Sequence, residues 1–212
     1  MIDLSHPLID GQPSFPGDPQ LKVEVVGTVP ANKYNLKRLT MGSHQGTHLD
    51  VPYHFFDDGR TIEEMPLERF FGPASLLDLA PGGNVPDGTA ITVGMVERRG
   101  DLFEPGARVL LRTGWYRNFG GESYFRGFPT LTVEAARWIA ERKIGLLGFD
   151  TPTPSTEWLT VHHTLLGKGV EMILVEGLTN LHLLPERFVF SALPLKIQRG
   201  DGSPVRACAI VE

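Results

Sequence analysis

The chain has 212 residues, with 41% hydrophobic and 21% charged side chains and a net charge of −5 at pH 7. This composition is typical of a soluble globular protein that forms one domain, residues 1–212. The negative charge argues against nucleic acid or an anionic membrane as the main partner.

The N-terminal residues lack the basic and apolar regions of a signal peptide. No apolar run approaches the roughly 18 residues that a transmembrane helix requires. We therefore expect a cytoplasmic protein that does not enter a membrane. The single cysteine, Cys208, excludes an internal disulfide and lies in an apolar run that is typical of a buried strand.

Residues 11–19 form the first irregular segment, with three prolines and two glycines. Such a density of both residue types predicts a loop of defined shape. Composition alone favours an ordinary surface loop.

Strand signals follow along most of the chain, as alternating or continuous apolar runs bounded by glycine, proline or aspartate. They cover residues 2–5, 21–29, 34–41, 74–80, 108–113, 144–149, 172–176, 188–197 and 205–211. The run 144–149 has almost no polar residue, which indicates a strand buried on both faces. Asp201 and Gly202 are interpreted as a turn between the last two strands.

Helix signals are fewer. Residues 132–143 carry apolar side chains on one face, Thr132 can cap the start, and Gly145 follows the end. Residues 158–168 form a second predicted helix, and shorter ones are expected at 92–99 and 62–71, the latter interrupted by proline. Because strands dominate, we expect a mixed α/β or α+β fold whose sheet is curled or layered to hide its edges.

The most informative stretch is residues 44–54, which place His44, His48, Asp50 and His54 at even positions. In an extended chain, side chains two residues apart project from the same side. Neutral imidazoles with a carboxylate suit a divalent metal such as zinc or manganese. A turn at Gly46 would break this alternation and leave the ligand set intact.

This stretch resembles the signature His-x-Gly-Thr-His-x-Asp-x-Pro-x-His of the cyclase family. These metal-dependent hydrolases include bacterial kynurenine formamidases and isatin hydrolases. All seven fixed positions match: His44, Gly46, Thr47, His48, Asp50, Pro52 and His54. The N-terminal Asp-Leu-Ser-His-Pro-Leu, followed by Pro-Gly-Asp, also resembles the family.

The resemblance implies a swivelling β/β/α-type domain, in which helices flank a curved mixed sheet. It places the loop of residues 11–19 beside the substrate pocket, with Phe15 as a candidate substrate contact. Tyr53, Phe55 and Phe56 are further aromatic residues for an apolar wall, although a core would use them equally well. The resemblance also implies a homo-oligomer, a dimer or a tetramer.

A second ligand set is expected near residue 170. Glu176 ends an apolar strand, where an unpaired buried carboxylate would be costly; an exposed strand end is the alternative. The resemblance pairs such a glutamate with a histidine, and the local pattern fits His162. The separation from Glu176 is longer than usual in the family, so His163 stays open as the alternative ligand.

These residues predict a metal-dependent hydrolase that acts on a small molecule, and the resemblance implies an amidohydrolase. One or two zinc or manganese ions, held by His44, His48, Asp50, His162 and Glu176, would activate water. His54 is the expected proton carrier, with a second-metal ligand as the alternative, and Thr47 is expected to orient a ligand. The resemblance implies an aryl formamide such as N-formyl-kynurenine, or a cyclic amide such as isatin.

Two other functions fit the same residues. A closed coordination shell without water would make the protein a non-catalytic metal-binding protein. The same scaffold could also open a lactone or catalyse a dehydration.

Overall fold

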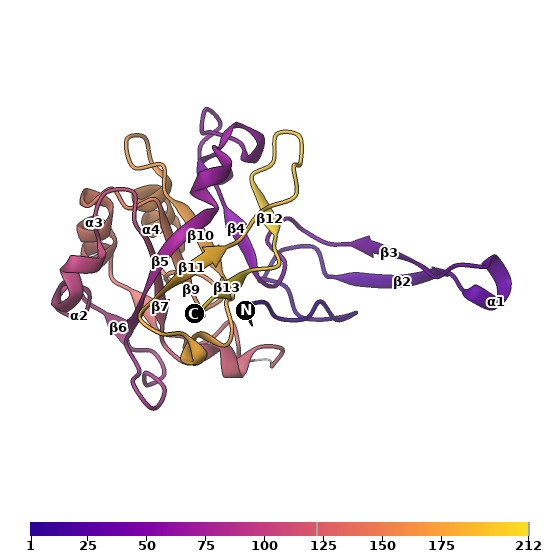
Figure 1. Ribbon diagram of the computed structural model, residues 1–212, viewed down its shortest axis with the longest axis horizontal. Coiled ribbons are helices and arrows are strands. Elements are labelled where there is room, and N and C mark those ends of the chain that lie inside the picture. The colour runs from indigo at the N-terminus through magenta and orange to yellow at the C-terminus, as the bar shows by residue number, and fades with distance from the viewer. Residues whose placement is uncertain (122, 212) are drawn as a thin grey trace.

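The computed structural model describes residues 1–121 and 123–211. Within them, one mixed sheet of nine strands forms the centre of the molecule (Figure 1). Its spatial order is β1 (Ile2–Asp3), β13 (Cys208–Ile210), β11 (Arg187–Ser191), β5 (Phe71–Asp78), β7 (Arg108–Arg112), β9 (Leu146–Phe149), β10 (Ile173–Glu176), β4 (His48–Asp50) and β12 (Gly202–Pro204). The central strands β5, β7, β9 and β10 run parallel, and their flanking partners run antiparallel.

The sheet is curled, which follows from its connectivity. β12 is the last strand of the order and β13 lies next to the first, yet only residues 205–207 join them. At no more than about 3.6 Å per residue, so short a link spans roughly 14 Å. The two ends of the sheet must therefore approach each other, and the expected curved, strand-rich mixed fold is confirmed.

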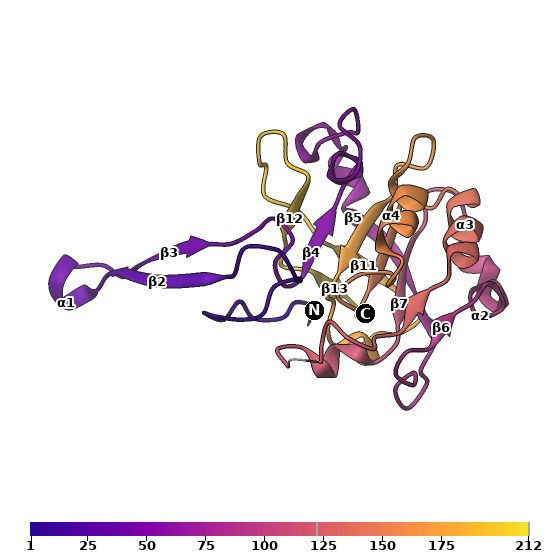
Figure 2. The same cartoon turned by 180° about the vertical axis from the view of Figure 1, so that it is seen from behind.

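Hydrophobic cores fill both faces of this sheet. One cluster lies within the curl, and a second lies between the outer face and the helices α3 (Val133–Glu141) and α4 (Trp158–Leu166). On β9, Leu146 belongs to the first cluster and Leu147 to the second. The prediction that this strand is buried on both faces is confirmed. Figure 2 shows both helices on the same side of the sheet.

The two main helices match their sequence signals. The Thr132 hydroxyl accepts a hydrogen bond from Ala135 N at 3.1 Å, which caps α3 as predicted. The expected helix at 92–99 divides into α2 (Val93–Val96) and the 3-10 helix η4 (Glu97–Leu102). Pro66 separates the 3-10 helices η2 (Ile62–Glu64) and η3 (Leu67–Arg69) because it has no amide hydrogen to continue a helix.

The remaining short elements lie in the loops around the sheet. They are η1 (Pro52–His54), η5 (Trp115–Asn118), η6 (Leu181–Leu183) and the parallel pair β6 (Ala90–Ile91) and β8 (Thr130–Leu131). Within the described residues, no helix has the length and apolar character needed to cross a membrane.

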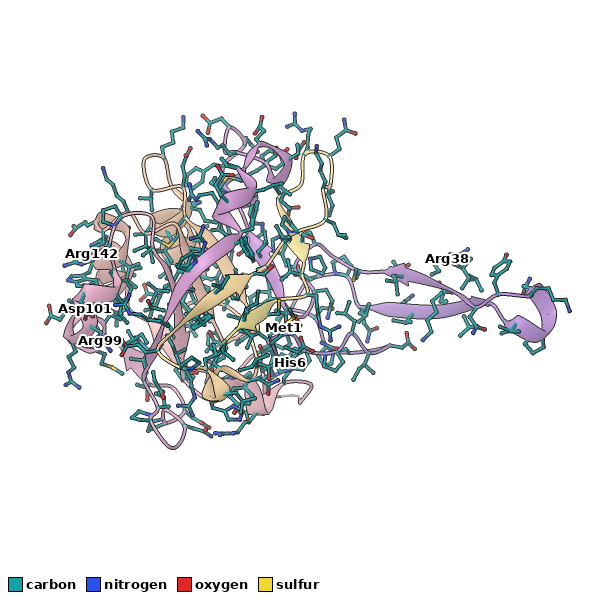
Figure 3. All side chains as sticks on the ribbon, viewed as in Figure 1. Met1, His6, Arg38, Arg99, Asp101 and Arg142 are labelled. Atoms are coloured by element: carbon teal, nitrogen blue, oxygen red, sulfur yellow. The ribbon has the colours of Figure 1, made fainter. Side chains whose placement is uncertain are left out.

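A hairpin projects far from the body of the molecule. It consists of β2 (Lys22–Gly27), α1 (Val29–Asn32) and β3 (Leu36–Thr40), and its strands pair only with each other (Figures 1 and 2). We call residues 22–40 the arm. The labelled Arg38 locates the arm in Figure 3, and no residue of α1 is buried.

Two details near the C-terminus differ from the sequence-based expectation. The strand expected at 188–197 ends at Ser191, after which the chain crosses to the far side of the curl. Gly202 is not in a turn but begins β12, opposite Asp50 of β4. That pairing, which the local sequence does not signal, brings residue 201 to the histidine-rich stretch.

Candidate active site

The register of two antiparallel strands builds the base of the site. β4 pairs with β10 so that His48 lies opposite Glu176 and Leu49 lies opposite Val175. Residues directly opposite each other project from the same face. His48, Asp50 and Glu176 therefore face α4, whereas Leu49 and Val175 belong to the core inside the curl.

Helix α4 adds a second histidine to this face. The buried His162 points its Nε2 at Glu176 Oε1, 3.3 Å away, and at Asp50 Oδ2, 3.6 Å away. His163 is exposed, and its ring lies beside Phe55 and Phe56. The structure thus brings His162, and not His163, into the cluster.

His44 and His54 reach the cluster by another route than the one predicted. Gly46 has a positive φ of 66°, so the chain turns before β4, and His54 lies in η1. The extended-chain argument is therefore wrong for these two histidines, although it holds for His48 and Asp50. His44 Nδ1 still lies 2.7 Å from Asp50 Oδ1, and its ring stacks on His54 at 3.8 Å.

Backbone carbonyls set the tautomers of two of the histidines. His48 Nδ1 donates to Gly46 O at 2.9 Å, and His162 Nδ1 donates to Trp158 O at 2.7 Å. Each neutral ring then directs the lone pair of Nε2 at carboxylate oxygens. For His48 these oxygens are Asp50 Oδ1 at 3.5 Å and Glu176 Oε2 at 3.4 Å. Such an arrangement calls for a positive charge between the groups, which a proton on Nε2 or a bound cation supplies.

The pKa values express the same need for positive charge. Burial by itself would lower the pKa of His44, but Asp50 and Asp201 raise it to about 10. Burial opposes the charge of His162 as well, and Asp50 with Glu176 raises its pKa to about 10. Burial favours the neutral form of Asp50, yet the neighbouring histidines hold the pKa of Asp50 well below its usual range.

The donor atoms form two adjoining groups that share Asp50. One group comprises His44, His48 and Asp50, and the other comprises Asp50, His162 and Glu176. Asp50 contributes Oδ1 to the first and faces the second with Oδ2. Neighbouring ligands of tetrahedral zinc lie about 3.3 Å apart. The measured separations of 2.7 to 3.6 Å are close to that value, so the residues fit a divalent metal.

Asp201 is the residue that sequence reasoning missed. Its Oδ2 lies 2.9 Å from His44 Nε2 and 3.5 Å from His54 Nδ1. His44, His54 and Asp201 form a third group of donor atoms close enough to hold an ion. A Cβ on Gly202 would collide with the His44 ring, so glycine is required beside it. The Asp-Gly dipeptide signals only a turn, and nothing in the local sequence marks Asp201 as part of the site.

Thr47 stabilises the loop that carries these histidines. Its hydroxyl donates to Gly177 O at 2.6 Å and accepts from His6 N at 2.9 Å. It therefore ties the histidine loop to the end of β10. Among the described residues, the hydroxyl bonds no histidine side chain, so the role of Thr47 in orienting a ligand stays a prediction.

A cavity of about 380 Å³ opens above the cluster. Its aromatic lining comprises Phe15, Phe55, Phe119, Tyr124, Phe125 and Trp158. Phe15 comes from the predicted loop and meets the Phe125 ring edge-on at 6.0 Å. Tyr53 and Phe56 pack against the two hydrophobic cores instead.

Comparison with known proteins agrees with this geometry. A family model described as "Putative cyclase" matches residues 2–156, which include the whole histidine-rich stretch. The chain belongs to the cyclase family. His162 and Glu176 lie beyond the matched region.

Relatives extend the likeness of this cyclase-family chain to nearly its full length. A kynurenine formamidase of Bacillus cereus is 30% identical over 210 residues, covering 97% of this chain and 95% of the relative. Isatin hydrolase A of Labrenzia aggregata, solved with benzyl benzoate, is 29% identical with a TM-score of 0.85, covering 98% and 92%. A structure described as a "potential metal-dependent hydrolase with cyclase activity" is 27% identical with a TM-score of 0.80, covering 98% and 95%.

Proposed function

We propose that this protein is a metal-dependent hydrolase that cleaves the C–N bond of a small amide. The substrate class is an aryl formamide such as N-formyl-kynurenine, or a cyclic amide such as isatin. The observation that carries the proposal is the convergence of two Nε2 lone pairs on two buried carboxylates beneath an aromatic cavity. The names of the relatives support the choice of an amide.

We assign the metal ligands from the two donor groups. His44, His48 and Asp50 hold one zinc or manganese ion, and His162 and Glu176 complete a second site with Asp50. When bound, such an ion polarises a carbonyl and lowers the pKa of water from about 15.7 to about 7.

His54 is the proton carrier in this proposal. Its side chain is 27% exposed and lines the cavity, and Asp201 lies on its Nδ1 side. That carboxylate stabilises the ring when it carries a proton. His54 takes a proton from the attacking water and returns one to the leaving nitrogen, as the C–O bond forms and the C–N bond breaks. The carboxylate product and the amine together account for the added water.

The aromatic lining positions the ring of the substrate. Phe15 and Phe125 form one wall. Phe55, which follows η1, and Trp158, which begins α4, also line the cavity. A cavity of about 380 Å³ accommodates one aromatic ring with its acyl substituent. Ligand pockets of this kind combine an apolar wall with a few polar groups that select the reacting atoms.

Two substitutions test the assignment. His54→Asn should lower kcat by at least about 100-fold and leave the metal content unchanged. His48→Ala should lose the metal and the activity together. The measurements are metal analysis by mass spectrometry and hydrolysis of formanilide, N-formyl-kynurenine, isatin and a small lactone, with each metal restored. Loss of metal from His54→Asn would make His54 a ligand, in keeping with the third donor group.

The same panel separates the rival functions. Full metal content without turnover of any substrate would favour a non-catalytic metal-binding protein. Turnover of the lactone alone would favour a related reaction on the same scaffold. We also infer a swivelling β/β/α-type fold, which the curled mixed sheet and the two helices on its outer face support.

We further propose that the protein is a homodimer in which each arm packs against the other copy. Val25 and Leu39 are 64% and 52% exposed on the arm, and an isolated two-stranded hairpin is marginally stable in water. The arm carries four basic residues and one acidic residue, whereas the whole chain has a net charge of −5. A second copy therefore offers the arm a surface of opposite charge.

Light scattering tests the dimer. The wild-type protein should have twice the mass of one chain, and the double variant Val25→Asp, Leu39→Asp should have the mass of one. Leu67→Asp is the matched control, because Leu67 is 69% exposed on the body of the molecule. A monomeric wild-type protein would contradict the proposal.

A further inference from the structure

The charged groups around the cavity have one sign apart from the histidines. Among the described residues that line it, every ionisable side chain belongs to a histidine, a carboxylic acid or a tyrosine: Asp18, His44, His48, Asp50, His54, Tyr124, His162 and Glu176. Asp50 and Glu176 lie at the base, where a metal would balance them. Asp18 is exposed and lies at the rim, on the proline-rich loop that also carries Phe15.

The basic residue nearest in sequence to the cluster is engaged elsewhere. Arg199 donates from its guanidinium to the Tyr53 hydroxyl at 2.9 Å, and its backbone N donates to Glu63 at 2.6 Å. Asp201, two residues later, adds a further carboxylate behind His44 and His54. Among the described lining residues outside the donor groups, Asp18 is therefore the one charged side chain, and it lies at the rim.

The position of the donor groups defines the orientation of a substrate in this cavity. Its amide must reach the donor cluster at the base, and its ring then lies between the aromatic walls. Any substituent on the far side of the ring projects towards the rim and Asp18. A carboxylate there meets the like charge of Asp18, and because Asp18 is exposed, solvent screens part of the repulsion.

We infer that the cavity selects aryl amides whose outer substituent is uncharged over those that carry a carboxylate, and that Asp18 determines this specificity. The inference rests on the proposed amide hydrolysis and names the substrate class more narrowly. An amino-acid substituent is intermediate, because its ammonium group partly compensates its carboxylate. For this chain, the inference therefore favours a neutral cyclic amide over an amino-acid formamide, the two substrate types named by the relatives.

Three aryl formamides with the same reacting group test the inference. They are 2′-formamidoacetophenone, which is neutral, N-formyl-kynurenine, which is zwitterionic, and 4-(2-formamidophenyl)-4-oxobutanoate, which carries the carboxylate alone. With the metal-loaded protein, kcat/KM should fall in that order, by up to about fivefold between the first and the last. Raising the salt concentration should increase kcat/KM for the carboxylate substrate and leave the neutral one unchanged.

Two variants assign the effect to one residue. Asp18→Asn should raise kcat/KM for the carboxylate substrate by up to about fivefold, with little change for the neutral one. Asp57→Asn, which removes an exposed carboxylate outside the cavity, is the matched control. Equal or better hydrolysis of the carboxylate substrate, or an unchanged ratio in Asp18→Asn, would overturn the inference and leave the proposed function intact. Hydrolysis of none of the three, and of no isatin either, would overturn both.

Discussion

The role of Asp201 is open to a direct test with Asp201→Asn. The substitution preserves the shape of the side chain and removes its charge. Asp201 Oδ2 lies 2.9 Å from His44 Nε2 and 3.5 Å from His54 Nδ1, so one change affects a proposed metal ligand and the proposed proton carrier. Carboxylates that hydrogen-bond a metal-ligating histidine fix its orientation and raise its basicity.

The exposure of the Asp201 carboxylate sets how much metal affinity and activity the variant should lose. Loss of such a partner typically costs 10- to 100-fold in metal affinity or activity. The Asp201 side chain is 38% exposed, so water screens part of its charge and the effect should lie at the lower end of that range. We expect about a tenfold loss of zinc affinity and about a tenfold loss of kcat/KM.

The assay has two independent readouts. Competition with a chromogenic chelator measures zinc affinity, and hydrolysis of formanilide by fully loaded protein measures kcat/KM. Asp57→Asn serves as the control, since it removes an exposed carboxylate three residues beyond His54. Unchanged affinity and unchanged kcat/KM in Asp201→Asn would refute the reasoning and reduce the Asp201 contacts to a screened surface interaction.

Three further predictions concern stability. Metal at 100 times its Kd should stabilise the fold by about 2.7 kcal/mol, which for 212 residues raises Tm by about 6 °C. In thermal unfolding, Asp50→Asn should abolish this shift, and a wild-type Tm that metal does not change would contradict the metal site. The buried Tyr124 hydroxyl has no hydrogen-bond partner among residues 1–121 and 123–211. Tyr124→Phe should therefore stabilise the protein by about 1 kcal/mol in urea unfolding, and a loss of stability would reveal a partner. The buried Asp150 carboxylate accepts hydrogen bonds from Thr113 N, Thr113 Oγ1 and Gly114 N. In Asp150→Asn the side-chain NH2 group would face these donors, so the variant should lose about 2 kcal/mol of unfolding free energy. Equal urea midpoints for variant and wild type would argue against this network.

Local signals account for the elements that sequence analysis located well. The helix at 132–143 has its own cap at Thr132 and its own apolar face, so its position depends on neighbours only a few residues away. The run 144–149 is apolar throughout because both faces of β9 are covered. The candidate metal ligands were predicted from residue type and motif, which do not depend on the conformation of the stretch.

The sequence by itself determined which donors are present, where the long helices and most of the strands lie, and that the chain belongs to the cyclase family. Only the tertiary structure decided which of these residues meet in the site. His162 and His163 are adjacent, and the packing of α4 on the sheet selects the first. Asp201 meets His44 across 157 positions because β12 pairs with β4. A contact of that kind depends on strand register and sheet curl, which the whole chain sets by burying both faces of the sheet, and no local pattern encodes it.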